Sequence, residues 1–264
     1  MWIGRGILPK GGKLMLCGGA KANKSFVGLE MAYSLATGTP LFNAYMGEVP
    51  IYPVPKACRV LYVEQEIGYA TLQERLHGRF KTRTMDGIEW YIKSKDVTLK
   101  LDEAAGYAAL CAEIAQVAPD VVILDPLKEF HDRDENSSQE MGYILRRVNE
   151  CIAQFNTTFI IIHHSGIPNP MFPRSGGYKM RGSSVLYGWC DSSLTLELLS
   201  EPSAAEQTMR MDFSLRHEKA PESIRIKRLL DGTIQYLGPV QASSNDGPKP
   251  YTPQPFAPRA FSKR

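Results

Sequence analysis

Continuous apolar runs alternate with amphipathic segments over the first two thirds of the chain. The runs are short, which is typical of buried strands, and they lie at 13–17, 59–66, 88–93, 120–125 and 157–164. The segments between them repeat apolar residues at helical spacing and predict helices at 25–38, 68–80, 101–118 (entered through Asp102) and 138–155. This alternation indicates an α/β fold with a mainly parallel, twisted sheet and helices on both faces.

Beyond residue 190 the pattern changes to strands without intervening helices. Strand-like segments rich in apolar residues follow one another at 192–199, 209–217, 222–229 and 233–237. Such a series predicts antiparallel strands. Residues 1–238 are therefore expected to form one domain.

The last segment, residues 239–264, differs from the rest in composition. It holds six prolines and few large aliphatic residues, so we expect a disordered, proline-rich tail. Its charges sum to the full formal net charge of +3, through Lys249, Arg259, Lys263 and Arg264 against Asp246. The remaining 238 residues are then neutral, which excludes a broadly basic nucleic-acid-binding surface and leaves only local phosphate sites.

Three features of the sequence bear on cellular location. The chain has no run of eighteen apolar residues, and its first residues lack the apolar core of a secretory signal. Its five cysteines are scattered, without metal-binding spacing. These features predict a cytoplasmic protein with reduced thiols and no contact with a membrane.

The stretch GGAKANKS, residues 18–25, is similar to the phosphate-binding loop G-x-x-x-x-G-K-[ST]. Gly18, Lys24 and Ser25 match this pattern, whereas Asn23 stands in place of the second glycine. Asparagine is among the residues that most readily accept a positive φ, so the substitution is compatible with such a loop. The context fits as well, because the stretch follows a predicted strand and opens a predicted helix.

This loop predicts ATP and Mg²⁺ as ligands. Backbone amides at the helix N-terminus would cradle the phosphates, Lys24 would neutralise them, and the Ser25 hydroxyl would bind magnesium. The expected nucleotide-binding residues are Gly18, Gly19, Ala20, Lys21, Ala22, Asn23, Lys24, Ser25 and Phe26.

Three further strands end in residues suited to the same chemistry. Asp125 closes an apolar run, where a carboxylate can hold magnesium through water. Glu64 and Glu66 end a strand expected to neighbour the phosphate loop, and on an extended strand they point to one face; either can activate the attacking water. His163 and His164 end a third strand and place an imidazole near the γ-phosphate, with a capped strand end as the alternative.

In order and spacing, these segments resemble RecA-fold ATPases of the RepA type, the small hexameric replicative helicases of plasmids and phages that are related to DnaB. The likeness runs through most of residues 10–238. It is carried by the stretches GGAKANKS, LATGTPLFN, VLYVEQEIGYATLQERL, VVILDPLKEFHDRDENSSQEM, FIIIHHSG and RGSSVLYGWCDSSLTLEL. The resemblance implies an ATP-hydrolysing homohexameric ring that acts on single-stranded DNA.

The resemblance also implies roles for single residues. The family's glutamate aligns with Glu66 rather than Glu64, so Glu66 is the expected activator of water. Asp125 takes the place of the magnesium-associated carboxylate. His164, or else His163, takes the place of the γ-phosphate sensor that relays nucleotide state to DNA-contacting loops.

The arginine finger departs from the family pattern. The position expected about ten residues after the Arg-Gly-Ser motif falls on Asp191. Arg216 is the better candidate for a cation that acts in trans, with Lys219 beside it. A solvated strand residue is the alternative interpretation of Arg216.

Single-stranded DNA is expected to contact the segment after the histidines, GIPNPMFPRSGGYKMRG. This segment interleaves aromatic rings, which offer stacking surfaces, with cations that neutralise phosphates, namely Arg174, Lys179 and Arg181. Three functions stay open at this point: a ring helicase, a recombinase-like or DNA-loading ATPase that does not unwind, and a nucleotide-binding regulatory or interaction protein.

Overall fold

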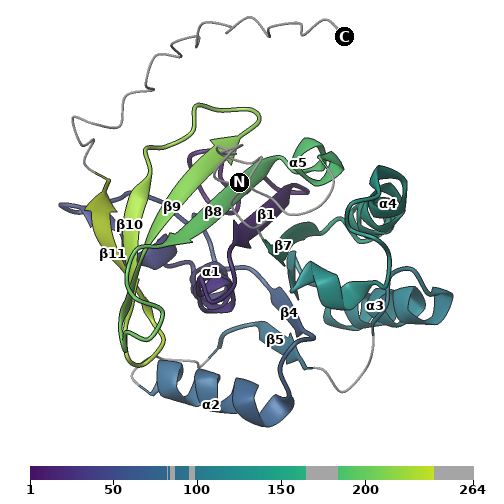
Figure 1. Ribbon diagram of the computed structural model, residues 1–264, viewed down its shortest axis with the longest axis horizontal. Helices are drawn as coiled ribbons and strands as arrows, with labels where there is room; N and C mark the ends of the chain where they lie inside the picture. The colour runs from purple at the N-terminus through teal and green to yellow at the C-terminus, as the bar shows by residue number, and fades with distance from the viewer. Residues whose placement is uncertain (82, 84–86, 95–98, 165–183, 241–264) are drawn as a thin grey trace, which may run out of the picture.

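The fold is built around one large sheet, seen in a computed structural model that describes residues 1–81, 83, 87–94, 99–164 and 184–240. In the described residues this sheet has nine strands in the order β11-β10-β9-β8-β1-β7-β6-β4-β5 (Figure 1). Its parallel part consists of β1 (Lys13–Gly18), β4 (Val60–Glu64), β5 (Trp90–Lys93), β6 (Val121–Asp125), β7 (Thr158–His164) and β8 (Ser192–Leu198). The predicted mainly parallel sheet is confirmed.

The strands after residue 190 extend this sheet on one side. The strands β9 (Gln207–Leu215), β10 (Ile224–Arg228) and β11 (Ile234–Pro239) follow one another in antiparallel pairs. The first of the four segments, β8, joins them to the centre because it pairs in parallel with β1 and antiparallel with β9. The antiparallel series is thus confirmed from β8 onward.

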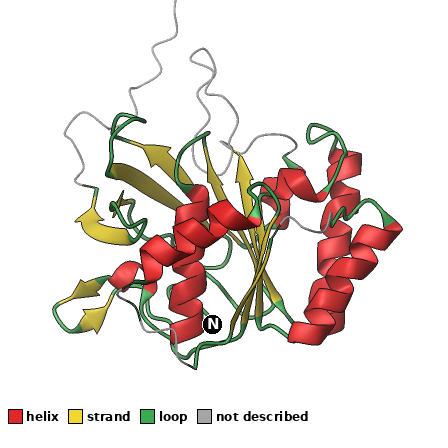
Figure 2. Cartoon of the chain, turned by 90° about the horizontal axis from the view of Figure 1, so that it is seen from below, coloured by secondary structure: helices red, strands yellow, loops and turns green. Residues whose placement is uncertain are grey.

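Helices lie on both faces of the sheet, as Figure 2 shows. They are α1 (Lys24–Thr37), α2 (Tyr69–Phe80), α3 (Ala104–Val117), α4 (Ser138–Phe155) and α5 (Val185–Trp189). Two 3₁₀ turns (Leu41–Asn43 and Leu127–Phe130) and a small hairpin of β2 (Tyr45–Met46) and β3 (Val49–Pro50) complete the described elements. None of the helices in the described part of the chain is long and apolar enough to cross a membrane.

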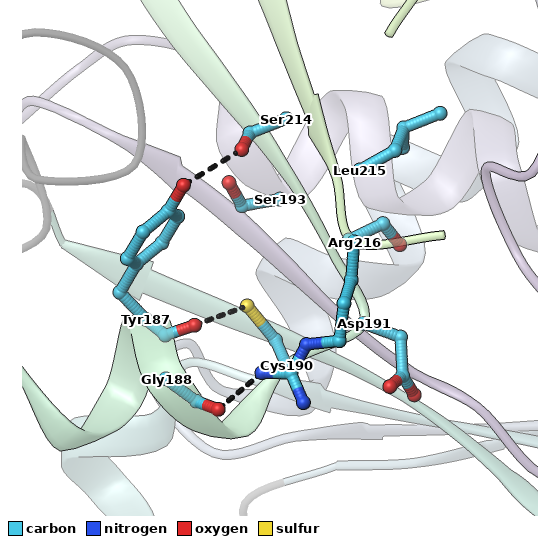
Figure 3. A pocket seen from close by; sticks show the side chains of 9 residues that line it. Tyr187, Gly188, Cys190, Asp191, Ser193, Ser214, Leu215 and Arg216 are labelled. Atoms are coloured by element: carbon cyan, nitrogen blue, oxygen red, sulfur yellow. Dashed lines mark hydrogen bonds between the residues drawn. The ribbon is translucent and has the colours of Figure 1, made fainter. Parts of the chain in front are cut away.

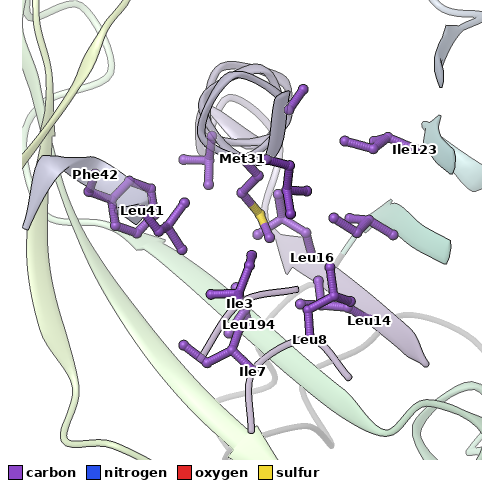
Figure 4. Close-up of a cluster of buried hydrophobic side chains, with 14 of the residues drawn as sticks. Ile3, Ile7, Leu8, Leu14, Leu16, Met31, Leu41, Phe42, Ile123 and Leu194 are labelled. Atoms are coloured by element: carbon purple, nitrogen blue, oxygen red, sulfur yellow. The ribbon is translucent and has the colours of Figure 1, made fainter. Parts of the chain in front are cut away.

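The two faces of the sheet bury separate apolar cores. Along β1, Leu14 and Leu16 point to the core beneath α1, together with the N-terminal residues Ile3 and Ile7 (Figure 4). The alternate residues of β1 pack against α3 and α4 on the other face. Strands buried on both faces explain the continuous apolar runs in the sequence.

Three local expectations are wrong. Helix α3 begins at Ala104 rather than through Asp102, whose carboxylate instead accepts the Asp132 amide at 3.4 Å. Strand β4 ends at Glu64, so Glu64 and Glu66 do not share one extended face. Strand β4 also does not neighbour β1, because β7 and β6 lie between them. Parallel strands are joined by crossovers, and sequence order therefore does not give strand order.

The ends of two elements bear on the predicted boundaries. Helix α1 ends at Gly38 with φ 73°, whose amide donates to Ser34 O at 2.9 Å, as expected from the glycine that follows its apolar pattern. Strand β11 runs to Pro239, and the Val240 amide still donates to Ser223 O at 2.7 Å. The predicted tail lies outside the described residues from position 241 onward.

Candidate functional site

A cavity of about 510 Å³ opens at the carboxyl edge of the parallel strands. The register brings the strand ends together there, since Gly18 pairs with His164 and Glu64 pairs with Asp125. The volume is within the roughly 300–1,000 Å³ of small-molecule sites. Its lining consists of Ala20, Lys21, Ala22, Asn23, Lys24, Ser25, Phe26, Glu66, Ile67, Arg75, Asp125, Pro126, His164, Pro202, Gln207 and Arg228.

The loop between β1 and α1 forms one wall of this cavity. Lys21 and Asn23 both adopt left-handed backbone conformations, with φ of 61° and 59°. Asn23 therefore accepts the positive φ expected of it. A Cβ at Gly18 would lie 3.1 Å from the Leu196 Cβ and 3.2 Å from the Ala22 Cβ, so close packing against β8 favours glycine at that position.

Lys24 is the buried cation of the site. Its Nζ donates to Gly19 O at 2.9 Å, and only 7% of the residue is exposed. Burial lowers the pKa of Lys24, whereas the nearby carboxylates of Asp125 and then Glu66 raise it. A partly desolvated ammonium at a helix N-terminus suits the binding of a phosphate.

Asp125 lies at the end of β6 and is fully buried. The Tyr62 hydroxyl donates to its Oδ2 at 2.5 Å, while the buried Oδ1 accepts no hydrogen bond of good geometry. Burial raises the pKa of Asp125, and the hydroxyls of Tyr62 and Ser25 oppose this rise. An unpaired carboxylate oxygen beside a serine hydroxyl is an oxygen donor set that fits Mg²⁺ or its bound water.

Glu64 and Glu66 have different environments. Glu64 is buried, and its carboxylate accepts the amides of Glu66 and Ile67, each at 2.8 Å. Burial raises the pKa of Glu64 to about 7, while the two amide hydrogen bonds oppose this shift. Glu66 is exposed and lines the cavity, which Glu64 does not. Of the two carboxylates, the structure brings Glu66 to the loop.

The paired histidines point away from each other. His164 is half-buried and lines the cavity, whereas His163 is fully buried at 3.9 Å from the Glu135 carboxylate. Burial, and then the charge of Lys24, lower the pKa of His164. Within the described part of the chain, no cluster of three or more His, Cys, Asp or Glu residues could hold a metal.

Sequence reasoning missed six residues of the cavity. Two of them, Ile67 and Pro126, directly follow predicted site residues, and the other four are Arg75, Pro202, Gln207 and Arg228. The guanidiniums of Arg75 and Arg228 lie 5.2 and 4.9 Å from the centre of the Phe26 ring. Burial, and then the charge of Arg75, lower the pKa of Arg228. Of these four, only Arg75 had a signal, since it lies in the stretch VLYVEQEIGYATLQERL that carries the resemblance. The other three lie on or before β9 and β10, which the strand order of the sheet brings near the loop.

The candidate trans-acting cations lie elsewhere. Arg216 follows β9 at the edge of the sheet opposite the cavity, where its guanidinium donates to Gly188 O (Figure 3). Lys219 lines a separate cavity of about 560 Å³. Asp191, at the position expected for the finger, uses its carboxylate to accept the Lys13 amide at 3.0 Å. Within one chain, Arg216 therefore does not reach the cavity.

The candidate DNA-contacting residues Arg174, Lys179 and Arg181 lie outside the described residues, in the segment 165–183. That segment begins directly after His164, which lines the cavity. The roles assigned to all site residues from the sequence stay predictions.

Comparison with known proteins bears on the family and the fold. The family model described as AAA domain (AAA_25) matches residues 1–169. Among solved structures, the chain is similar to a KaiC-like protein, PH0186, from the hyperthermophilic archaeon Pyrococcus horikoshii OT3. The two are 12% identical and share a TM-score of 0.55 over 87% of this chain and 91% of that one. With the family model matching well over half of its length, the chain belongs to the AAA domain family of P-loop ATPases and has a RecA-like fold.

Proposed function

We propose that this protein is an ATP-dependent DNA motor, a ring helicase of the RepA type that acts on single-stranded DNA in the replication of a plasmid, phage or other mobile element. The observation that carries the ATPase part is the convergence of Lys24, Ser25, Glu66, Asp125 and His164 at one cavity. These residues come from four separate segments of the chain, and each has a distinct task in phosphoryl transfer.

In this proposal the loop amides and Lys24 bind the phosphates of ATP, and Ser25 and Asp125 hold Mg²⁺. Magnesium supplies charge neutralisation on the phosphates when it is bound. Glu66 accepts a proton from the attacking water, since it is the carboxylate that lines the cavity. His164 lines the cavity, and burial and then the charge of Lys24 lower its pKa, which favours a neutral imidazole that contacts the γ-phosphate by hydrogen bonding.

The position of the candidate DNA-contacting residues in the sequence supports the DNA part of the proposal. The location of Arg216 in the sheet supports the ring part. The segment with Arg174, Lys179 and Arg181 follows the candidate sensor His164 directly, so a change at the γ-phosphate can pass to it along the chain. Arg216 lies at the opposite end of the strands from its own cavity, which supports its proposed role at the cavity of a neighbouring subunit in a ring. An oligomer with one nucleotide per subunit boundary is the arrangement proposed.

The test is ATP turnover with and without single-stranded DNA, together with native mass and strand separation. DNA-stimulated turnover by a hexamer that separates strands supports the helicase. DNA-stimulated turnover by a filament without strand separation favours the recombinase-like or DNA-loading ATPase. Nucleotide binding with no response to DNA favours the regulatory protein, and no nucleotide binding at all refutes all three.

A further inference from the structure

The side chain of Asn23 links the phosphate loop to a distant strand. Its amide donates to Gln207 Oε1 at 2.9 Å and approaches Met209 Sδ at 3.5 Å. Gln207 is the first residue of β9 and is 95% buried, with 5% exposed. Its own amide donates to Pro202 O at 2.7 Å. A chain of two hydrogen bonds thus runs from the loop through β9 to the turn that precedes it.

We propose that Asn23 is a positioning residue that holds the loop ready for nucleotide by its bond to Gln207. The proposal rests on the nucleotide-binding role proposed above. Glycine would adopt the same positive φ without strain, but it has no side chain to form the bond and loses more conformational freedom when the loop becomes ordered. Asparagine is the substitution that keeps the backbone conformation and adds a fixed contact.

The same bond also orders the opposite wall of the cavity. Both Gln207 and Pro202 line it, as does Arg228, which donates to Ala205 O at 3.1 Å in the same turn. Breaking the bond to Asn23 therefore releases the loop on one side and Gln207 on the other. Both walls are predicted to lose order together.

The first readout needs no nucleotide. In the full-length protein, Asn23→Gly and Gln207→Ala should each speed hydrogen exchange of the amides at 19–26, by about two- to tenfold for one lost hydrogen bond. The double variant should exchange no faster than the faster single variant, because both changes remove the same bond.

The second readout separates positioning from stability. Each single variant should bind MgATP about three- to tenfold more weakly and raise KM by the same factor, while kcat stays within about twofold. A residue that only stabilised the fold would lower the active fraction and leave KM unchanged.

Two control substitutions separate the bond from the backbone. Asn156→Gly makes the same replacement at φ 51°, at the end of α4, and should change neither exchange of the loop nor affinity. Asn23→Ala removes the bond and also adds left-handed strain, so it should be worse than Asn23→Gly.

The proposal is overturned if Asn23→Gly binds MgATP as tightly as the wild type or exchanges at the wild-type rate. Unchanged exchange in Gln207→Ala overturns it as well, and if that variant does not fold, Asn23→Gly alone decides. If the wild-type protein binds no nucleotide, the proposed function is wrong, which is a separate outcome from failure of the positioning role. The exchange data would then still decide whether the bond orders the loop.

Discussion

At the scale of single residues, Lys24 is the group on which nucleotide binding depends most. It is a buried cation in the loop, with a carbonyl oxygen as its hydrogen-bond partner, and phosphate oxygens are stronger partners for it. Lys24→Ala should weaken MgATP binding at least about thirtyfold, in line with the loss of one member of a buried charged pair. Equilibrium titration measures this. Lys21→Ala is the control, because Lys21 is exposed on the same loop and should change affinity severalfold at most.

Glu66 and Glu64 are distinguished by a second pair of variants. Glu66→Gln should keep MgATP binding and lower kcat about 10²–10⁴-fold, the usual contribution of a general base. Burial raises the pKa of Glu64 to about 7, which suits a base, but position comes first, and its carboxylate is occupied by the amides of Glu66 and Ile67. If Glu64→Gln is the variant that binds ATP without turnover, the assignment of Glu66 is wrong.

The raised pKa of Glu64 also predicts a dependence of stability on pH. Its pKa is about 7 in the folded protein, against 4.5 as the ordinary value, because burial disfavours the charge. Between these values the folded protein binds more protons than the unfolded chain, so this group lowers the free energy of unfolding as pH rises from about 4.5 to 7. Glu64→Gln should lack that loss when urea unfolding is compared with the wild type across this range. Parallel pH profiles would contradict the prediction.

At the scale of elements, a buried ion pair joins the two helices that flank the cavity. Glu30 of α1 pairs with Arg79 of α2, which also donates to Gly232 O, and Arg83 adds a contact to Glu30 at 3.2 Å. Helix α1 starts at the phosphate loop and α2 follows Glu66, so this pair fixes both walls. Glu30→Gln should destabilise the protein by about 3–5 kcal/mol, because Arg79 would keep a buried charge without its counter-ion.

A matched surface pair provides the control for Glu30→Gln. Glu89 pairs with Arg59 where both side chains are partly exposed, at 52% and 34%. Solvent screens such a pair, so Glu89→Gln should cost far less stability than Glu30→Gln in the same urea experiment. Equal losses for the two variants would show that the Glu30 pair is not the stronger link.

The sequence predicts helices and strands well where apolar residues recur at a regular helical or strand spacing. Helix α4 has the predicted bounds of 138–155 because its apolar stripe is regular and Ser137 caps its start. The N-terminal residues were not predicted to pack in the core, since Ile3, Ile7 and Leu8 follow neither a helical nor a strand period. The site shows the same limit. The phosphate loop is contiguous and was found, whereas Gln207 is 184 residues from Asn23 and reaches it only through the strand order.

At the scale of the whole molecule, the candidate nucleotide cavity lies at the carboxyl ends of the parallel strands. Arg216 lies at the opposite ends of these strands, beside the start of β8. Strand β9 connects them, since Gln207 at its start lines the cavity and Arg216 follows its end. A subunit therefore presents its cavity on one side and its candidate finger on the other. That polarity suits head-to-tail assembly, which closes into a ring when the rotation between subunits allows it.

The location of the positive charges predicts how affinity for single-stranded DNA depends on salt concentration. Residues 1–238 are formally neutral, so affinity for single-stranded DNA must come from a local patch or from the tail. Each phosphate contact contributes about −0.7 to the slope of log affinity against log salt.

Replacing Arg174 and Lys179 with alanine should weaken DNA binding and flatten that slope by about 1.4, as measured by titration across salt concentrations. Deleting 241–264, which leaves β11 whole, is the control, because a basic tail adds only nonspecific attraction. If that deletion abolishes DNA binding and the double alanine variant keeps the wild-type slope, DNA does not pass along the segment after His164. The protein would then act as an ATPase switch tethered to DNA by its tail.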